Sequence, residues 1–442
     1  MSDLHGLNLN VTVPLEGGHR LPVVVYVHGG GFVFGSGSYS HYDQSKVVEL
    51  SSIMNQPIIA VNINYRLGIA GFLSSEELTA AGIPSNRGLL DMIVALGWLK
   101  TFISGFGGDP DNITAVGQSA GAASLCYLLG HEEPLFRQAV LLGGTFLMMR
   151  PRSTRQAEVL YGEIIDTLGL TSMSPNERLK ALLSMPSDKL VPMTPDVVRL
   201  GPVIDNSVIL QKPTFSNLGN NELILPGKTW CQKIYLVQSE FDGSIFDQVN
   251  LGLRPPGVGD AFRQHLEDSF GVKRAAIVIE TYKLMGNIPD SLAVENITNL
   301  ITDIMFLAPA IALSEAWVGR AVLGLFNEHN PWNGPYKGKA NHLLDVALLW
   351  GNFNGVYEQK PWTVARALAE SFVSFVNNKV DLPLFDQQER VTVFGPSDED
   401  VSSTIVGLKD EKAKRSRDIF KLAANVGGLD ALLDSVQSFL SS

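Results

Sequence analysis

Short runs of aliphatic and β-branched residues alternate along the first third of the chain with stretches of helical periodicity. The run at 22–27 is apolar at every position, which suits a strand buried on both faces of a mostly parallel sheet. Similar runs follow at 57–63, 113–116 and 139–142. Residues 43–54 look helical, and 87–104 has helical apolar spacing with Asn86 as a possible cap. This alternation predicts right-handed βαβ units and a doubly wound, mostly parallel α/β sheet.

The pattern changes beyond residue 150. Helical stretches fill approximately 150–225 and 250–320, separated by another apolar run at 233–239. A late strand is predicted at 323–327, an edge strand at 7–13, and further helices near 361–378 and 430–440. We interpret the two helical regions as insertions that form a cap over the sheet. The sequence shows no internal repeat or obvious linker, so we expect residues 1–442 to form a single domain.

Composition narrows the class of protein. The chain has 442 residues, of which 45% are hydrophobic, and a net charge of −11. The hydrophobic fraction indicates a globular protein, and the negative charge argues against nucleic acid as a partner. We expect no membrane span, because the most apolar segment, 300–317, is interrupted by Asp303 and Glu315.

The N-terminus and the cysteines bear on location and cofactors. No basic region followed by an apolar run is visible at the N-terminus, so we expect a cytoplasmic protein without a secretory signal. Only Cys126 and Cys231 are present, which fits a reducing compartment without a disulfide framework. They lack metal-site spacing, and we expect neither a metal nor a cofactor.

The segment 111–124 carries the strongest chemical signal. It reads as a short strand, the turn Gly117-Gln118-Ser119-Ala120-Gly121, and a helix rich in small residues. A Gly-x-Ser-x-Gly turn between strand and helix is typical of a nucleophile elbow, in which the serine is exposed at the edge of a sheet. Ser119 is therefore the candidate nucleophile. The alternative is a glycine-rich turn without a chemical role.

A second glycine-rich loop, His28-Gly29-Gly30-Gly31-Phe32, follows the run at 22–27. Such a loop could bind phosphate, but the G-x-G-x-x-G and Gly-Lys-Ser/Thr signatures are absent. It could instead supply backbone N–H groups to an oxyanion hole. Together with Ser119, the loop favours the second interpretation.

A serine nucleophile needs a base, and the base needs an acid that orients it. His342 follows a glycine-rich loop after the last predicted strand and is the favoured base, with His329 as competitor. His265 lies in a polar helical stretch and reads as a solvated side chain. For the acid, Asp242 precedes a glycine after the run at 233–239, while Glu240 and Asp345 remain open.

Several blocks together resemble the type-B carboxylesterase family, the cholinesterase-like branch of the α/β-hydrolases. The matching blocks are Asn64-Tyr65-Arg66-Leu67-Gly68, Phe106-Gly107-Gly108-Asp109-Pro110, Gly117-Gln118-Ser119-Ala120-Gly121, Pro331-Trp332-Asn333-Gly334 and Asn341-His342, the later ones resembling fungal members. The resemblance implies an α/β-hydrolase fold, with Ser119 as nucleophile, His342 as base and Asp242 as acid. It also implies an oxyanion hole formed by the N–H groups of Gly30, Gly31 and Ala120.

The chain departs from the family pattern at three places. Asp242 stands where the family usually has a glutamate, so the backbone must come closer or Glu240 must take the role. Leu142-Gly143-Gly144 replaces a Gln-Ser-Gly block whose hydroxyl would support the acid. The chain also begins near the family's Asp-Cys-Leu segment, here Asp3-Leu4-His5, which implies a more open site or a shortened chain.

We therefore expect a serine hydrolase that cleaves carboxylic esters of small molecules through an acyl-enzyme on Ser119. The same groups could serve an acyltransferase, thioesterase or lactonase, and the family also includes non-catalytic binding proteins. The pocket is expected to draw on the 150–225 insertion and the 250–310 helices. Five aromatic residues could line it or belong to the core: Phe32, Phe34, Phe146, Phe246 and Phe306. The sequence gives neither the particular ester nor the oligomeric state.

Overall fold

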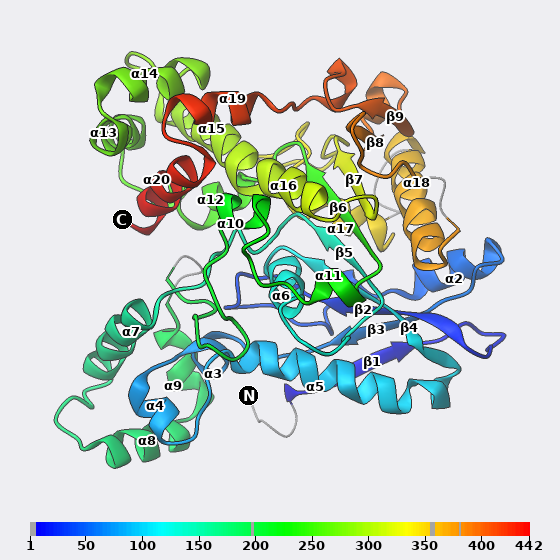
Figure 1. The fold of residues 1–442 in the computed structure, drawn as a ribbon, viewed down its shortest axis with the longest axis horizontal. Helices are drawn as coiled ribbons and strands as arrows, with labels where there is room; N and C mark the ends of the chain where they lie inside the picture. Colours follow the sequence, from blue (N-terminus) through cyan, green and yellow to red (C-terminus); the bar gives the residue numbers. More distant parts are fainter. Residues whose placement is uncertain (1–5, 196–198, 354–358, 380–381) are drawn as a thin grey trace.

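A nine-stranded sheet runs through the centre of the protein in the computed structural model, which describes residues 6–195, 199–353, 359–379 and 382–442 (Figure 1). The strands are β1 (Leu9–Thr12), β2 (Leu21–Val27), β3 (Ile59–Ile63), β4 (Gly108–Gln118), β5 (Gln138–Leu142), β6 (Lys233–Ser239), β7 (Ala321–Phe326), β8 (Arg390–Phe394) and β9 (Ser403–Gly407). Their order is β1-β3-β2-β4-β5-β6-β7-β8-β9. All neighbours pair in parallel except β1 with β3 and β8 with β9, so the antiparallel pairs lie at the two edges.

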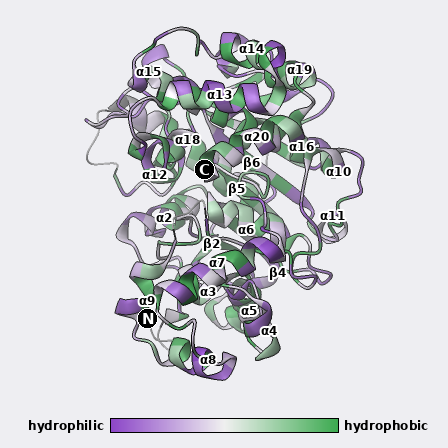
Figure 2. Ribbon diagram, turned by 90° about the vertical axis from the view of Figure 1, so that its left-hand side faces the viewer, coloured by the Kyte–Doolittle hydropathy of each residue, from purple (hydrophilic) through white to green (hydrophobic). Residues whose placement is uncertain are grey.

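The central strands are buried on both faces, as their apolar runs predict. In β2, Val23, Val25 and Val27 pack into one core, and Val24 and Tyr26 pack into the other. A strand projects successive side chains to opposite faces, so a continuous apolar run fills two layers at once. Figure 2 shows the same contrast, with hydrophobic strands inside and hydrophilic residues on outer helices such as α8 (Pro175–Ser184).

Helices cover both faces of the sheet. The helices α2 (Ser45–Ile53), α17 (Leu344–Leu349) and α18 (Gln359–Val376) contribute to one core. The opposite core includes residues of α5 (Arg87–Phe102), α6 (Ala120–Leu128) and α16 (Ala308–Ala316). The structure therefore has the expected α/β-hydrolase architecture, a mostly parallel sheet between two helical layers.

Two helical segments interrupt the alternation, close to the predicted insertions. Between β5 and β6 lie α7 (Thr154–Thr167), α8, α9 (Ser187–Leu190), α10 (Phe215–Gly219) and α11 (Gly227–Trp230). Between β6 and β7 lie α12 (Ser244–Val249), α13 (Val258–Phe270), α14 (Val272–Thr281), α15 (Asp290–Ile301) and α16, with a π-helix at Thr302–Leu307. The short helices α3 (Gly68–Phe72) and α4 (Glu76–Ala80) precede α5, and α19 (Asp418–Asn425) and α20 (Leu429–Ser441) end the chain. The division into one domain with a cap stays a prediction.

The sequence predicted the cap position of α5 correctly at Asn86, but the Asn86 side chain does not cap the helix. Asn86 adopts a left-handed conformation (φ 54°), and its carbonyl accepts the N–H groups of Leu89 and Leu90, but its side chain makes no capping hydrogen bond to α5. Its amide instead donates to the Val203 carbonyl and to Asp205, and its oxygen accepts from the Val203 N–H. A capping side chain accepts N–H groups of its own helix, but this buried side chain binds the 150–225 insertion to the start of α5.

Two helical stretches are long and apolar enough to span a membrane by length and composition, at 87–106 and 290–316. The second overlaps the segment 300–317 that the sequence marked as most apolar, and 83% of its most apolar window is buried inside the protein. The corresponding window of the first is 33% buried. Core helices share these properties, so the expectation of no membrane span stays a prediction.

Candidate active site

Ser119 lies at the sharp turn between β4 and α6, with φ 54° and ψ −121°. A non-glycine residue rarely adopts a positive φ, and such strain is characteristic of functional turns. The flanking glycines make the turn possible. A Cβ atom on Gly117 would lie 2.4 Å from the Gly121 carbonyl oxygen, and one on Gly121 would lie 2.1 Å from that of Val27. The first turn of α6 can therefore pack directly against β2 and β4, which leaves Ser119 at the tip.

The glycine loop after β2 faces this serine. Gly30 has φ 108°, and a Cβ atom there would lie 2.0 Å from the Phe34 carbonyl oxygen. The Gly30 carbonyl accepts the N–H groups of Val33 and Phe34, so the loop turns back on itself. Within the described residues, the N–H groups of Gly30, Gly31 and Ala120 have no hydrogen-bond acceptor. Unpaired N–H groups beside a nucleophile can stabilise a developing oxyanion.

His28 supports the loop from beneath. Its ring stacks on Tyr65 with centroids 4.5 Å apart, and its Nδ1–H donates to the Gly29 carbonyl at 2.8 Å. Burial lowers the pKa of His28 to about 4, so the ring is neutral at physiological pH. His28 therefore acts as a fixed support for the loop.

Asp242 and His342 form a buried pair. The Nδ1–H of His342 donates to Asp242 Oδ1 at 2.8 Å, and both side chains are shielded from solvent. Asp242 Oδ2 accepts the Ser239 N–H at 2.6 Å, and the His342 N–H donates to the Ser244 hydroxyl at 3.0 Å. Each partner is thus fixed by a second hydrogen bond. The pair leaves the lone pair of Nε2 available as a base.

The Gln118 side chain makes a hydrogen bond to that lone pair. Its Nε2–H donates to His342 Nε2 at 3.1 Å, and the Gln118 side chain is fully buried. The Ser119 hydroxyl has no hydrogen-bond partner among the described residues, although Ser119 and His342 line the same cavity. Catalytic hydrogen bonds are often incomplete without substrate. For His342 to act as the base predicted from the sequence, this hydrogen bond to Gln118 would have to break.

The other candidates do not contact Ser119 or hydrogen-bond to His342. His329 is partly exposed and contacts Asp398 at 2.9 Å, not Ser119. His265 is not a freely solvated side chain, because its Nε2–H donates to the Ser435 carbonyl at 2.8 Å. Asp345 accepts the Val346 N–H and makes no hydrogen bond to His342. The structure thus brings Asp242 to His342 and keeps the competing base apart.

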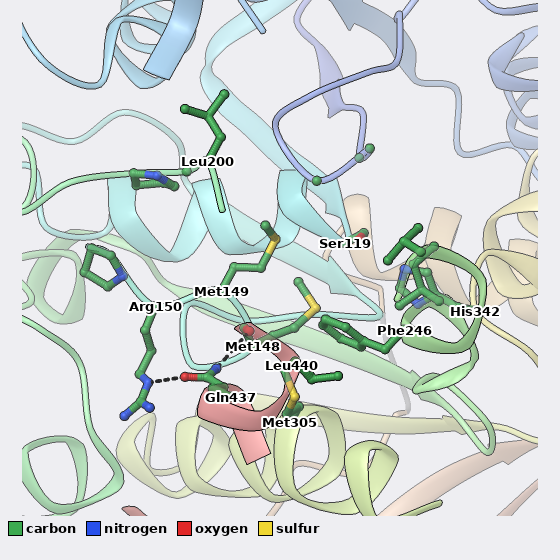
Figure 3. Close-up of a pocket in the computed structure, with 18 of the residues that line it drawn as sticks. Ser119, Met148, Met149, Arg150, Leu200, Phe246, Met305, His342, Gln437 and Leu440 are labelled. Atoms are coloured by element: carbon green, nitrogen blue, oxygen red, sulfur yellow. Dashed lines mark hydrogen bonds between the residues drawn. The ribbon is translucent and has the colours of Figure 1, made fainter. Parts of the chain in front are cut away.

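The cavity beside Ser119 has a volume of about 750 Å³. Figure 3 shows Ser119 and His342 on one side, Arg150 and Gln437 on another, and Met148 and Phe246 between them. Of the five aromatic candidates, Phe34 and Phe246 line the cavity. Phe306 packs edge-on against His342, with ring centroids 5.6 Å apart, whereas Phe32 and Phe146 are buried core residues.

The sequence did not point to the last helix as part of this wall. Asp434, Gln437, Ser438, Leu440 and Ser441 of α20 all line the cavity. The expected walls were the 150–225 insertion and the 250–310 helices, and both contribute. An amphipathic pattern shows that a helix packs against a core, but not which cavity its polar face borders. No sequence signal identified α20 as a wall.

This fold and site define an α/β-hydrolase of the serine type. A strained serine follows a central parallel strand, and a histidine held by a carboxylate lies at the same edge of the sheet. The carboxylesterase family model matches residues 5–416. The chain therefore belongs to the carboxylesterase family.

Curated relatives carry esterase and lipase names. The para-nitrobenzyl esterase of Bacillus subtilis is 29% identical over 364 residues, which cover 79% of this chain and 68% of the relative. Lipase 4 of Diutina rugosa is 31% identical over 60% of this chain and 49% of its own length. Juvenile hormone esterase of Heliothis virescens is 36% identical over 40% of this chain and 30% of its own length.

Solved structures share the fold over most of the chain. A PNB esterase superimposes with a TM-score of 0.72 at 23% identity, covering 92% of this chain and 84% of the other. A carboxylesterase of Geobacillus stearothermophilus gives a TM-score of 0.70 at 24% identity, covering 95% and 85%. Likenesses at this level of identity establish the α/β-hydrolase fold.

Family and relatives together make this chain a carboxylic ester hydrolase, as the sequence predicted. They do not favour the alternative of an acyltransferase, thioesterase, lactonase or binding protein. The relatives come from bacteria, yeasts, insects and mammals, so the resemblance to fungal members in particular is not shown.

Proposed function

We propose that this chain hydrolyses small-molecule carboxylic esters in two steps, with Ser119 as nucleophile, His342 as base and Asp242 as the acid that orients it. The observation that carries the proposal is the buried 2.8 Å hydrogen bond between Asp242 and His342 beside the strained Ser119. That bond fixes the tautomer in which Nε2 can accept a proton. Burial of the pair keeps water from competing for the bond.

In the first step, Ser119 Oγ attacks the ester carbonyl carbon and its proton moves to His342 Nε2. The carbonyl oxygen becomes an oxyanion, which accepts hydrogen bonds from the N–H groups of Gly30, Gly31 and Ala120. The intermediate then collapses, the bond to the alcohol oxygen breaks, and His342 gives its proton to that oxygen. The alcohol leaves, and the acyl group remains on Ser119.

In the second step, water takes the place of the alcohol. His342 accepts a proton from the water, whose oxygen attacks the acyl carbon and forms a second oxyanion in the same hole. Collapse breaks the bond to Ser119 Oγ, which recovers its proton from His342. The carboxylic acid is released and the enzyme returns to its starting state.

A fluorophosphonate probe and a short-chain nitrophenyl ester test this proposal. We expect the probe to label the wild type and not Ser119→Ala, and His342→Ala to remove nearly all esterase activity. His329→Ala is the matched control, because His329 contacts Asp398 outside the site, and it should retain activity. Equal labelling of wild type and Ser119→Ala, or loss of activity in His329→Ala alone, would overturn the assignment.

A further inference from the structure

We propose that the ester substrate of this site carries a carboxylate, which Arg150 binds across the cavity from Ser119. This inference rests on the proposed hydrolysis at Ser119 and names the substrate class. Arg150 has no role in the two chemical steps. Figure 3 shows it on a different wall of the same cavity from Ser119 and His342.

Arg150 is a buried cation, and one nitrogen of its guanidinium makes no hydrogen bond within the described residues. Its side chain is only 6% exposed. Its Nε–H donates to Gln437 Oε1 at 2.7 Å, and Nη2 donates to Asp434 Oδ1, both on α20. Nη1 is buried and has no hydrogen-bond partner in the described part of the chain. An unsatisfied donor on a buried charge is costly, so an acceptor supplied by a ligand would be bound strongly.

The charges around Arg150 favour an anion. Lys212 lines the same cavity, and among the described residues that line it Asp434 is the one carboxylate. Lys212 shares that carboxylate with Arg150, at 3.4 Å from the same oxygen. Two cations, Arg150 and Lys212, thus share one carboxylate, in a chain whose net charge is −11. This local excess of positive charge would attract an anionic group into the cavity.

The cavity wall between Ser119 and Arg150 is apolar. Met148, Met149, Phe246, Met305 and Leu440 border the cavity between the serine and the arginine (Figure 3). An apolar chain gains free energy by lying along such a surface, whereas a charged group there would lose its hydration. The substrate that fits both features has an apolar spacer between its scissile ester and its carboxylate.

Asp434 holds the place that the substrate carboxylate would take. It binds Arg150 through Nη2 alone, and its side chain is 56% exposed. Asp434 can therefore turn into solvent. Nη1 is shielded from solvent in this structure, so a substrate carboxylate must first displace Asp434; if it then bridges Nη1 and Nη2, it makes the paired hydrogen bonds that a guanidinium forms best.

Two series of esters test the proposal. One has nitrophenyl half-esters of dicarboxylic acids, and the other has butyrate esters of hydroxy acids, so the carboxylate lies on either side of the scissile bond. Each is compared with a neutral ester of the same chain length, and the readout is the ratio of kcat/KM, acidic over neutral. We expect a ratio above one in at least one series. Arg150→Gln should lower that ratio by about tenfold or more, as for a lost charge-assisted hydrogen bond.

A second variant covers the case in which Arg150→Gln does not fold. Asp434→Asn keeps an oxygen for Nη2 but removes the competing charge, so it should raise the ratio. Arg366→Gln is the matched control, because Arg366 is an exposed arginine paired with Glu370 on α18, and it should leave the ratio unchanged. A wild-type ratio at or below one in both series, an equal loss on both esters in Arg150→Gln, or a lower ratio in Asp434→Asn would overturn the subsite. Probe labelling of Ser119 with turnover of neutral esters would show that the proposed hydrolysis stands without it.

Discussion

Phe241 and Asn341 form an isolated parallel β-bridge, although they lie 100 positions apart in loops after β6 and β7. The Phe241 N–H donates to the Ala340 carbonyl at 2.9 Å. Asp242 and His342 each follow a bridge residue, so the backbones of the proposed acid and base are held side by side. This proximity explains how an aspartate, one methylene shorter than the family's glutamate, reaches the imidazole at 2.8 Å.

The first prediction concerns the acid. Asp242→Asn should lower kcat for a nitrophenyl ester by about 10³–10⁴-fold with little change in KM, because the amide no longer fixes the reactive tautomer of His342. Glu240→Gln is the matched control. The backbone carbonyl of Glu240 accepts from Arg415, and we expect its variant to change kcat by less than about twofold. The opposite ranking of the two variants would assign the role to Glu240.

The second prediction concerns Gln118. In Gln118→Glu, a buried carboxylate would replace the amide that contacts His342 Nε2. An adjacent negative charge favours the protonated imidazole, which cannot accept the serine proton. The acidic limb of the kcat/KM profile should therefore move to higher pH, by about one unit. Gln248 lines the same cavity without contacting His342, and Gln248→Glu should leave that limb in place. An unshifted limb in Gln118→Glu would contradict the role of this contact.

The third prediction concerns the oxyanion loop. Gly30→Ala places a methyl group against the Phe34 carbonyl at a φ that alanine rarely adopts, so the loop must move. The Gly30 N–H would move with it, and losing one oxyanion donor typically costs about 10²–10³ in kcat. Gly97 lies in α5 with nothing near its Cβ position, and Gly97→Ala should retain full activity. Steady-state kinetics with a circular dichroism check of folding would decide, and a fully active Gly30→Ala would rule out the role.

The fourth prediction concerns pH and stability. Burial, and then the charge of Asp242, raise the pKa of Asp345 from its ordinary 3.8 to about 7. Between these values the folded protein binds more protons than the unfolded chain, so this carboxyl lowers stability as pH rises from about 4 to about 7. Asp345→Asn cannot titrate and keeps an acceptor for the Val346 N–H. The Tm of Asp345→Asn minus the Tm of wild type should therefore be more positive at about pH 8 than at about pH 5.

Thermal melts at the two pH values would check this. Asp268→Asn, at an exposed position on α13, serves as the control and should shift Tm equally at both. A Tm difference for Asp345→Asn that does not change with pH would contradict the prediction.

The sequence predicted the central strands well because a parallel strand buried on both faces must be apolar throughout, as at 22–27. Strands β8 and β9 were not predicted. Their runs are short, and their antiparallel pairing at the sheet edge is set by tertiary contacts more than by a distinctive pattern. The position of Asn86 at the start of α5 was predicted, but the partner of its side chain was not, because Val203 lies 117 positions away.

The residues of the proposed triad could be chosen from the sequence because their order and their turns are local signals. Ser119 lies between two glycines, Asp242 precedes Gly243, and His342 follows a late loop. The walls of the cavity could not be predicted from the sequence, because Arg150 and Gln437 are 287 positions apart and meet only in the folded chain. The hydrogen bond between Gln118 and His342 could not be predicted either, because the Gly-x-Ser-x-Gly pattern does not specify where the side chain of its second residue points.

Helix α20 lines the cavity but contains none of the three residues of the proposed triad, which bears on evolution and engineering. Asp434, Gln437, Ser438 and Ser441 follow a helical i, i+3, i+4, i+7 spacing and face the cavity, while Leu432, Leu433 and Val436 anchor the helix in the core. Substitutions on the cavity face could change which esters enter without touching Ser119, Asp242 or His342. One short segment encoded far from the nucleophile would then be enough to diversify substrate range while the reaction stays the same.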